Sequence, residues 1–271
     1  MKASILINNY NNELYLEQCI ESAVKQSCPA HEVIIYDDGS TDGSRDIIDG
    51  FAKDHPKIKT IYRSNYGKAH NINQANGVYQ AFKSSSGDQI FLLDGDDAYE
   101  PNHLESYQNA FKQQEQCVVQ SPLICIDRSG TRTHTKEREQ EAIKDPFKFV
   151  SANANFSFYY TTSAVAITRD LLEKALPHDF AKFPLFAIDA ILCLYGAASG
   201  NLQTVEEPST LYRIHGENRS SRFHSKRFRL KFDYQSLQYY NLVAANWNKP
   251  RLSRGKFLFQ RGMQALRKAL S

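Results

Sequence analysis

Short apolar runs alternate with longer amphipathic segments along the first 110 residues of the chain. Four runs are too short for helices and rich in β-branched residues, so they predict buried strands at residues 3–8, 32–36, 57–63 and 89–94. Helical spacing of apolar residues between and after them predicts helices at residues 13–27, 42–53, 69–83 and 101–115. This alternation predicts an α/β fold with a mostly parallel sheet flanked by helices.

Polar clusters follow three of the predicted strands. They read NNYNN after the first strand, DDGSTDGS after the second and DGDD after the fourth. The carboxyl ends of parallel strands lie at one edge of an α/β sheet, and ligands bind there. We therefore expect the three clusters to converge on one site.

The cluster Asp94-Gly95-Asp96-Asp97 places three carboxylates directly after a buried strand. Asp-Gly favours turns and Asp caps helices, so one interpretation is a solvated turn. Crowded carboxylates, however, raise each other's pKa, and a divalent cation would relieve that repulsion. Oxygen ligands favour Mg²⁺ or Mn²⁺, and Mg²⁺ usually combines one or two carboxylates with phosphate oxygens. The second interpretation is therefore a metal–diphosphate site.

The cluster Asp37-Asp38-Gly39-Ser40 has two interpretations as well. It is either a turn or a carboxylate site that accepts hydrogen bonds from a base or a ribose. The chain has no G-x-G-x-x-G after the first strand and no G-x-x-x-x-G-K-[ST], which disfavours dinucleotide-binding and P-loop proteins. A nucleotide would then be held by carboxylates and a metal instead of a glycine loop.

Several segments together resemble the family 2 inverting glycosyltransferases, which have a GT-A fold. In residues 1–110 these are SILINNYNNELYLEQCIESAVKQS, EVIIYDDGSTDGS, RSNYGKAHNIN and IFLLDGDDAYEP. Residues 186–221 also resemble that family, because an acidic residue opens a helix and a Tyr-Arg-x-His strand follows. The resemblance implies a metal-dependent hexosyl- or N-acetylhexosaminyltransferase in bacterial surface glycan or glycoprotein assembly. It would move a sugar from a nucleotide sugar, most often a UDP-sugar, to a hydroxyl of a glycan, glycolipid or glycoprotein.

The resemblance also implies roles for individual residues on the nucleotide side. Tyr10 would stack on the base, Asn8 would line it, and Asp38 would hydrogen-bond to it, with Asp37 supporting the turn. Asp94 would contact the ribose or a metal-bound water. Further residues near the nucleotide would be Asn65, Gly67 and Lys68.

On the metal and acceptor side, the resemblance makes Asp96 a direct ligand of Mn²⁺ or Mg²⁺. His215 would be a further contact to the metal or the diphosphate, unless it is a strand histidine satisfied by a neighbour. Asp189 would be the catalytic base that takes the proton from the acceptor hydroxyl. Many relatives have a Glu-Asp pair where this chain has Ile188-Asp189, so an N-capping role for Asp189 stays open. Arg213 and Arg219 are candidates to reach phosphate.

Residues 222–271 differ from the rest in charge. They hold twelve Lys or Arg and one Asp, a net of +11, and because the whole chain carries +3 the remainder carries −8. We expect a catalytic domain at 1–221, with a nucleotide-binding half at 1–110 and an acceptor half at 111–221, followed by a basic helical extension. The extension would contact an anionic membrane surface, or pack on the domain or a second copy. No nucleic-acid fold signature accompanies the charge, so nucleic acid is disfavoured.

Composition bears on location. The five cysteines are scattered and form no C-x-x-C pair, which indicates free, mostly buried thiols in a cytoplasmic protein. No apolar run is long enough for a transmembrane helix, and the N-terminal apolar run is too short for a signal peptide. We therefore expect a cytoplasmic location. Alternatively, the basic extension would hold the protein peripherally at the inner face of the cell membrane.

Two other classes of protein compete with the glycosyltransferase. A sugar nucleotidyltransferase would show a glycine-rich loop with Lys or Arg after the first strand, where this chain has NNYNNE. A non-catalytic nucleotide-sugar-binding or assembly protein would bind UDP and tolerate the loss of Asp189.

Overall fold

The computed structural model describes residues 2–112, 116–136, 143, 145–154, 158–180, 182–215 and 226–270. Its strands are β1 (Ala3–Asn9), β2 (Glu32–Asp37), β3 (Ile58–Tyr62), β4 (Gln89–Asp94), β5 (Ala98–Tyr99), β6 (Val118–Gln120), β7 (Leu123–Ile126), β8 (Arg132–Lys136), β9 (Val165–Thr168), β10 (Leu202–Thr204) and β11 (Thr210–Arg213). Its helices are α1 (Glu13–Val24), α2 (Ser44–Asp54), α3 (His70–Ser84), α4 (His103–Phe111), α5 (Pro146–Asn153), the 3₁₀ helix η2 (Thr162–Ala164), α6 (Arg169–Ala175), α7 (Ile188–Ser199), α8 (Lys226–Asn246) and α9 (Arg254–Leu270).

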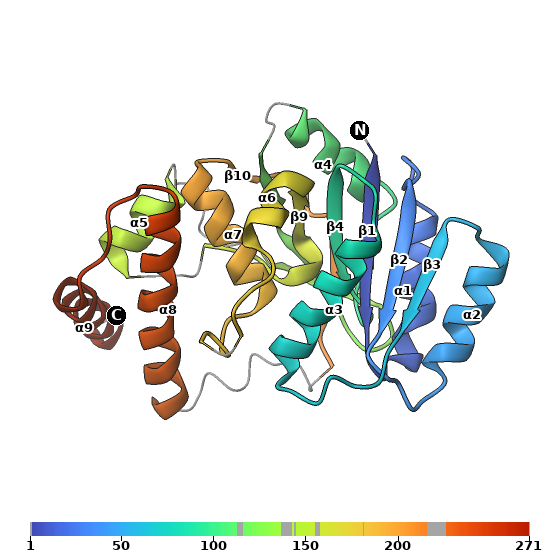
Figure 1. The fold of residues 1–271 in the computed structure, drawn as a ribbon, viewed down its shortest axis with the longest axis horizontal. Helices are drawn as coiled ribbons and strands as arrows, with labels where there is room; N and C mark the ends of the chain where they lie inside the picture. The colour runs from blue at the N-terminus through green and yellow to red at the C-terminus, as the bar shows by residue number, and fades with distance from the viewer. Residues whose placement is uncertain are drawn as a thin grey trace.

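A seven-stranded central sheet organises the molecule, in the order β10-β6-β9-β4-β1-β2-β3 (Figure 1). Strands β3, β2, β1 and β4 are parallel, as predicted, and β10 is parallel to β6. Strand β9 is antiparallel to both β4 and β6. A second sheet, in the order β5-β11-β7-β8, was not predicted from the sequence. Its strands are too short to show a periodic pattern.

Every predicted strand and helix of the first half is present, with ends that differ by a few residues. The strands alternate their apolar side chains between two cores. In β1, Leu6 joins the core on the α3 and α7 side, whereas Ile5 and Ile7 join the core under α1, α2 and α4. The central sheet is therefore covered by helices on both faces, as the near-continuous apolar strands indicate.

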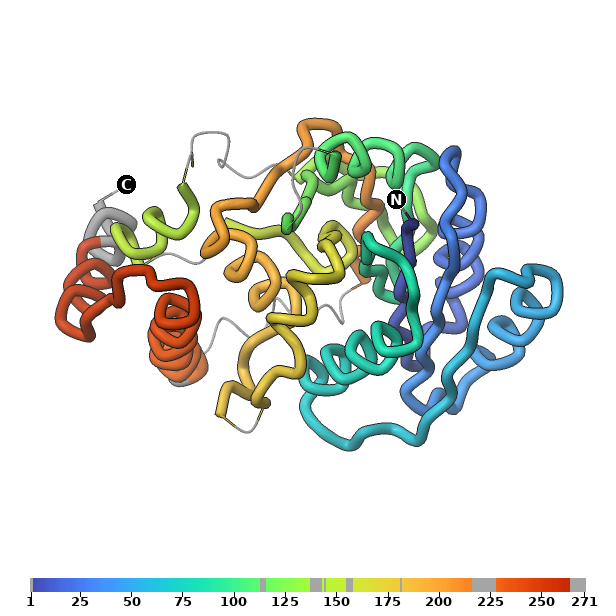
Figure 2. The backbone as a smooth tube through the Cα atoms, turned by 45° about the horizontal axis from the view of Figure 1, so that its top comes forward, coloured from blue at the N-terminus to red at the C-terminus, as the bar shows by residue number. Residues whose placement is uncertain are grey.

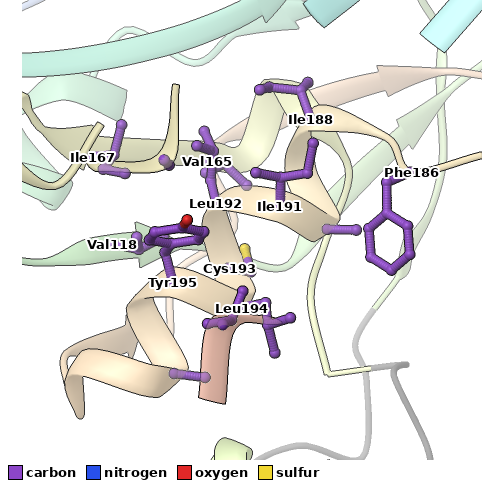
Figure 3. Close-up of a cluster of buried hydrophobic side chains, with 14 of the residues drawn as sticks. Val118, Val165, Ile167, Phe186, Ile188, Ile191, Leu192, Cys193, Leu194 and Tyr195 are labelled. Carbon is purple, nitrogen blue, oxygen red and sulfur yellow. The ribbon is translucent and has the colours of Figure 1, made fainter. Parts of the chain in front are cut away.

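Helix α7 lies in the middle of the larger core and is buried on nearly every side (Figure 3). Its apolar side chains pack between the strands β6, β9 and β10 and the helices α3, α5, α6 and α8, which accounts for an almost wholly apolar sequence. Packing on all sides fixes the position of the helix, and therefore of the first turn that carries Asp189.

The basic extension packs on the rest of the molecule. Helix α8 contacts α7, and α9 contacts α5, so the two helices form one end of the structure (Figures 1 and 2). Tyr239 and Tyr240 of α8 are buried in the larger core, and Asp233 pairs with Arg261 at 2.6 Å to join α8 to α9. The domain boundary predicted at residue 221 lies outside the described residues.

None of the described helices combines the length and apolarity that crossing a membrane requires. The five cysteines are free, and all but Cys28 are buried, which confirms the expectation of unpaired thiols.

Candidate active site

The carboxyl ends of β1, β2 and β4 bring the three polar clusters together. In the sheet register, Asn8 lies opposite Asp94 and Asn9 lies opposite Asp37. The next residues continue the contact, because the Gly95 N–H donates to the Asn8 carbonyl at 2.9 Å and the Asp38 N–H donates to the Asn9 carbonyl at 3.0 Å. The predicted convergence on one edge of the sheet is confirmed.

Asp37 is buried and holds the turn after β2. Its Oδ1 accepts hydrogen bonds from the N–H groups of Gly39 at 3.2 Å and Ser40 at 3.0 Å. Its Oδ2 accepts from the Asn9 amide at 2.9 Å and from the Ser40 hydroxyl. These bonds occupy both carboxylate oxygens, so Asp37 supports the turn, as predicted.

Asp38 is also buried, and it accepts hydrogen bonds from the Tyr36 hydroxyl of β2 at 3.4 Å and from the segment before α3. The Tyr66 N–H donates to Asp38 Oδ1 at 3.1 Å, and Asn65 Nδ2 donates to Oδ2 at 3.3 Å. Gly67, at a φ of +71°, donates its N–H to Asn65 Oδ1 at 2.8 Å. Burial raises the pKa of Asp38. The structure thus brings Asp38, Asn65 and Gly67 together as the resemblance implies.

The remaining nucleotide-side candidates surround this unit. Asn8 belongs to β1 next to Asn9, and Tyr10 follows β1 with 46% of its surface exposed. Lys68 is exposed just before α3, and its backbone N–H donates to Asn73 Oδ1 at 3.1 Å. An exposed aromatic ring and an exposed cation beside a buried carboxylate are a set of groups suited to a base and a phosphate.

The carboxylates after β4 are crowded and largely buried. Gln74 Nε2 donates to both Asp94 oxygens, at 2.8 and 2.9 Å. Asp97 accepts from the Ser163 hydroxyl at 2.6 Å and from the Arg213 N–H at 2.8 Å. Burial, and then the charge of Asp96, raises the pKa of Asp94 to about 8 and that of Asp97 well above its usual range. The crowding inferred from the sequence is therefore present.

Asp96 meets His215, which comes from the segment after β11. His215 Nε2 lies 2.8 Å from Asp96 Oδ2, and the two side chains are 13% and 24% exposed. The described residues hold no group of three or more His, Cys, Asp and Glu side chains placed to bind a metal. A divalent cation at Asp96 and His215 would therefore complete its coordination with water and phosphate oxygens, as Mg²⁺ commonly does.

Arg213 has a structural role in this arrangement. It is 1% exposed, and its guanidinium donates to the carbonyl oxygens of Asp96 at 2.8 Å and Asp127 at 3.0 Å. It also donates to Gln18 and lies over the Tyr15 ring. The prediction that Arg213 could reach a phosphate is therefore wrong, because the guanidinium is buried against backbone carbonyls. Arg219 lies outside the described residues.

Asp189 is half-buried in the first turn of α7. The N-cap of α7 is Ala187, so the capping role left open for Asp189 is wrong. Its Oδ1 accepts from the Ala190 N–H at 2.6 Å. The Asp189 charge also contributes to the raised pKa of Asp94, which places the two carboxylates within electrostatic reach of each other. A role for Asp189 beside the cluster at the end of β4 therefore stays a prediction.

Two site residues were not found from the sequence. Gln74 lies on the inward face of α3 and touches Asp94, and Ser163 links Asp97 to the backbone N–H of Asp94. A polar residue among the buried apolar positions of α3 was a usable signal for Gln74. For Ser163 the sequence gave no specific signal, because residues 153–163 indicated packing or a border of the acceptor site and no role for this side chain.

The glycosyl transferase family 2 model matches residues 4–175, more than half of the chain. The chain belongs to glycosyltransferase family 2. The uncharacterized glycosyltransferase alr2836 of Nostoc sp. is 32% identical over 221 residues, which are 80% of this chain and 66% of that protein. A Campylobacter jejuni GalNAc(5)-diNAcBac-PP-undecaprenol beta-1,3-glucosyltransferase is 33% identical over 35% of this chain and 30% of its own length. The chain thus spans two thirds or less of these relatives.

Solved structures support the fold. S. aureus TarS in complex with UDP-GlcNAc aligns with a TM-score of 0.64 at 16% identity, over 91% of this chain and 67% of that chain. The mannosyltransferase PcManGT of Pyrobaculum calidifontis, in complex with GDP-Man and Mn²⁺, aligns with a TM-score of 0.55 at 14% identity, over 98% of this chain and 80% of that chain. The expected GT-A fold is confirmed.

Replacing the neighbouring residues Asp37 and Asp38 by Asn should have different effects on the stability of the protein. Asp37→Asn removes charged acceptors from the turn after β2 and should lower the free energy of unfolding by about 2 kcal/mol. Asp38→Asn should leave the free energy of unfolding at pH 7 unchanged or raise it. The pKa of Asp38 is higher in the folded protein than in the unfolded chain, so ionisation of Asp38 above its unfolded-state pKa destabilises the fold, and Asn cannot ionise. Urea denaturation without nucleotide measures both. Equal destabilisation by the two substitutions would contradict these assignments.

Proposed function

We propose that the chain is a metal-dependent inverting glycosyltransferase that uses a nucleotide sugar in the assembly of a surface glycan. The observation that carries the proposal is the placement of two kinds of carboxylate in one site. Asp94, Asp96 and Asp97 end β4, while Asp189 comes from a separate buried helix within electrostatic reach of Asp94. An inverting transfer uses charge stabilisation at the leaving diphosphate and a base for the attacking hydroxyl.

On the donor side, the unit of Asp38, Asn65 and Gly67 would hold the base and ribose, with Asn8 lining the base and Tyr10 stacked on it. Lys68 is placed to meet phosphate. TarS was solved with UDP-GlcNAc and PcManGT with GDP-Man, so both relatives in fold hold a nucleoside-diphosphate sugar. Uracil and guanine both offer an N–H to a carboxylate such as Asp38, and we propose a UDP-sugar as the donor because the family resemblance favours it.

Asp96 and His215 are the residues that would hold the cation, with Asp94 contacting the ribose or a bound water. Mn²⁺ or Mg²⁺ supplies Lewis-acid stabilisation of charge on a leaving diphosphate. The donor set suits such a cation, because the Asp96 carboxylate lies 2.8 Å from His215 Nε2 and close to Asp94 and Asp97, whose pKa values are raised by burial and by the charge of Asp96.

Asp189 would accept the proton of the acceptor hydroxyl as that oxygen attacks the anomeric carbon. The hydroxyl is of a glycan, a glycolipid or a glycoprotein. The bond to the diphosphate breaks on the opposite face of the sugar, so the anomeric configuration inverts. The buried helix α7 holds the carboxylate in place, which contributes the orientation that such a transfer needs.

Separating Asp96 from Asp189 tests this proposal. Thermal stability with a panel of UDP-, GDP-, CMP- and dTDP-sugars, each with Mn²⁺, Mg²⁺ or EDTA, should show a metal-dependent shift with a UDP-sugar. A ligand at a hundred times its Kd stabilises by about 2.7 kcal/mol. Asp96→Asn should lose the metal-dependent shift. Asp189→Asn should keep it and release UDP at least about a hundredfold more slowly, since a positioned base contributes on that order.

The outcomes separate the competing classes. A thermal shift with a UDP-sugar, without detectable turnover in either the wild type or Asp189→Asn, would indicate a binding protein. Release of diphosphate from a nucleoside triphosphate and a sugar phosphate would indicate a nucleotidyltransferase. No shift with any nucleotide would contradict the donor site itself.

We also propose that the extension brings the enzyme to an anionic membrane at the inner face of the cell membrane, where a lipid-linked acceptor would lie. Helix α9 exposes an apolar face formed by Leu258, Phe259 and Met263. Arg254 and Lys256 are exposed on the same helix, and the extension as a whole is strongly basic. Apolar side chains flanked by cations suit an interface of anionic lipid.

Vesicle flotation tests the membrane contact. The double variant Leu258→Ser, Phe259→Ser should bind vesicles of anionic lipid at least about tenfold more weakly than the wild type, because each large apolar side chain contributes more than about 1 kcal/mol when buried. Leu14→Ser is the matched control, since Leu14 is 79% exposed on α1 at the opposite end of the molecule. Equal binding by all three proteins, or a dimer that the double variant dissolves, would contradict the proposal.

A further inference from the structure

Asn71 ties helix α3 to the segment that leads into α7. The residue is 1% exposed, and its Nδ2 donates to the carbonyl oxygens of Pro184 and, at 3.0 Å, Phe186. Ala187 then caps α7, and Asp189 lies in its first turn. Asn71 therefore holds the backbone three residues before the proposed base.

The amide is held by this contact at a cost. Asn71 Oδ1 is buried without a hydrogen-bond partner among the described residues. A buried polar oxygen left without a partner is unfavourable, so a side chain chosen for stability alone would be apolar here. The two carbonyl oxygens that it satisfies are the feature that accounts for an amide at this position.

The same face of α3 reaches the other side of the site. Gln74, one turn further along, donates to both oxygens of Asp94 and to the Thr162 hydroxyl at 3.2 Å. Gly77, a further turn along, approaches so closely that a Cβ there would lie 2.0 Å from Asn8 Oδ1. One helix thus contacts the segment before Asp189, the carboxylates after β4 and the end of β1.

The segment before α7 is held from its other side by the extension. Gln235 of α8 accepts a hydrogen bond from the Leu185 N–H at 3.1 Å, and the Phe186 ring packs 4.6 Å from the Tyr239 ring, measured between centroids. Asn71 joins this segment to α3, and Gln74 joins α3 to Asp94. The contacts from α8 hold the same segment, but α3 is the helix that carries both Asn71 and the residue bonded to Asp94.

We propose that Asn71 is a positioning residue that sets the place of Asp189 relative to Asp94, and that it acts on turnover without contributing to donor binding. This inference rests on the proposed role of Asp189. Loss of the Asn71 amide would release the 184–186 segment from α3 while its contacts with α8 remain, and the first turn of α7 would shift relative to Asp94. A displacement of the base by about 1 Å can slow a reaction about a hundredfold.

The test is a double-variant cycle on Asn71 and Asp189, with UDP release from a UDP-sugar as the readout. Asn71→Ala should lower kcat by about 10- to 100-fold and leave the donor KM and the donor-induced thermal shift within about twofold. In the Asp189→Asn background, Asn71→Ala should cause no further loss, because the residue acts through Asp189. Asn71→Ser keeps one donor, should lose less activity, and serves if the alanine variant does not fold.

Gln260→Ala is the matched control. Gln260 also donates its amide N–H groups to two backbone carbonyl oxygens, those of Ser151 and Ala152 in the last turn of α5. Its Oε1 is also buried without a partner among the described residues, but Gln260 lies on α9, away from the proposed base. Its kcat should equal that of the wild type.

Three results would overturn the inference. The first is a wild-type kcat in both Asn71→Ala and Asn71→Ser. The second is a kcat of the Asn71→Ala, Asp189→Asn double variant that falls by the product of the two single losses. The third is a loss of kcat in Gln260→Ala as large as that in Asn71→Ala. Wild-type turnover in Asp189→Asn would instead overturn the proposed function, and the inference with it. An inactive Asp189→Asn beside a fully active Asn71→Ala would overturn the inference alone.

Discussion

Electrostatic repulsion among the carboxylates after β4 is the constraint on which the site depends. Asp94 and Asp97 are buried beside Asp96, and burial together with that charge raises the pKa of both. Hydrogen bonds support such an arrangement, and either protonation or a bound cation relieves the repulsion. Gln74, Ser163 and the Arg213 backbone supply the hydrogen bonds. A divalent cation bound together with a diphosphate would supply positive charge beside these carboxylates and reduce their repulsion.

The surrounding fold can be understood as the means of holding these groups. Arg213 uses its guanidinium to fix the backbone after β4 and after β7, and the same strand delivers His215 to Asp96. The second sheet is therefore part of the site, because β11 belongs to it. On the other side, α3 and the buried α7 place Asp189. Residues far apart in the chain thus meet at one edge of the central sheet.

The first half of this architecture could be predicted from the sequence because its strands are long enough to show a pattern. The apolar runs before Asn8, Asp37 and Asp94 gave the parallel strands, and their polar ends gave the location of the site. Strand β6 has only three residues and β8 has no apolar residue, so neither shows a comparable signal. The antiparallel β9 and the second sheet could therefore only be seen in the structure.

Residue roles divided along a similar line. The types needed for binding a nucleotide and a cation could be named from a resemblance, and the structure brings Asp38 to Asn65 and Asp96 to His215. Arg213 could not be assigned correctly, because its chemistry suits phosphate and only its burial shows that carbonyl oxygens occupy it. The role of Asn71 could not be assigned, because its partner Phe186 lies 115 residues further along the chain. Gln74 was missed although its polar side chain stands among buried apolar positions of α3, because its partner Asp94 lies on β4.

The stereochemistry of donor cleavage tests the central claim, that a base on one side of the sugar opposes a charge-stabilised leaving group on the other. When a glycosyltransferase hydrolyses its donor without an acceptor, proton NMR can identify the anomer of the free sugar that forms first, before mutarotation mixes the two anomers. The account predicts that an α-linked UDP-sugar yields the β-anomer first, and that Asp189→Asn forms little of it. The α-anomer as the first product would contradict the account.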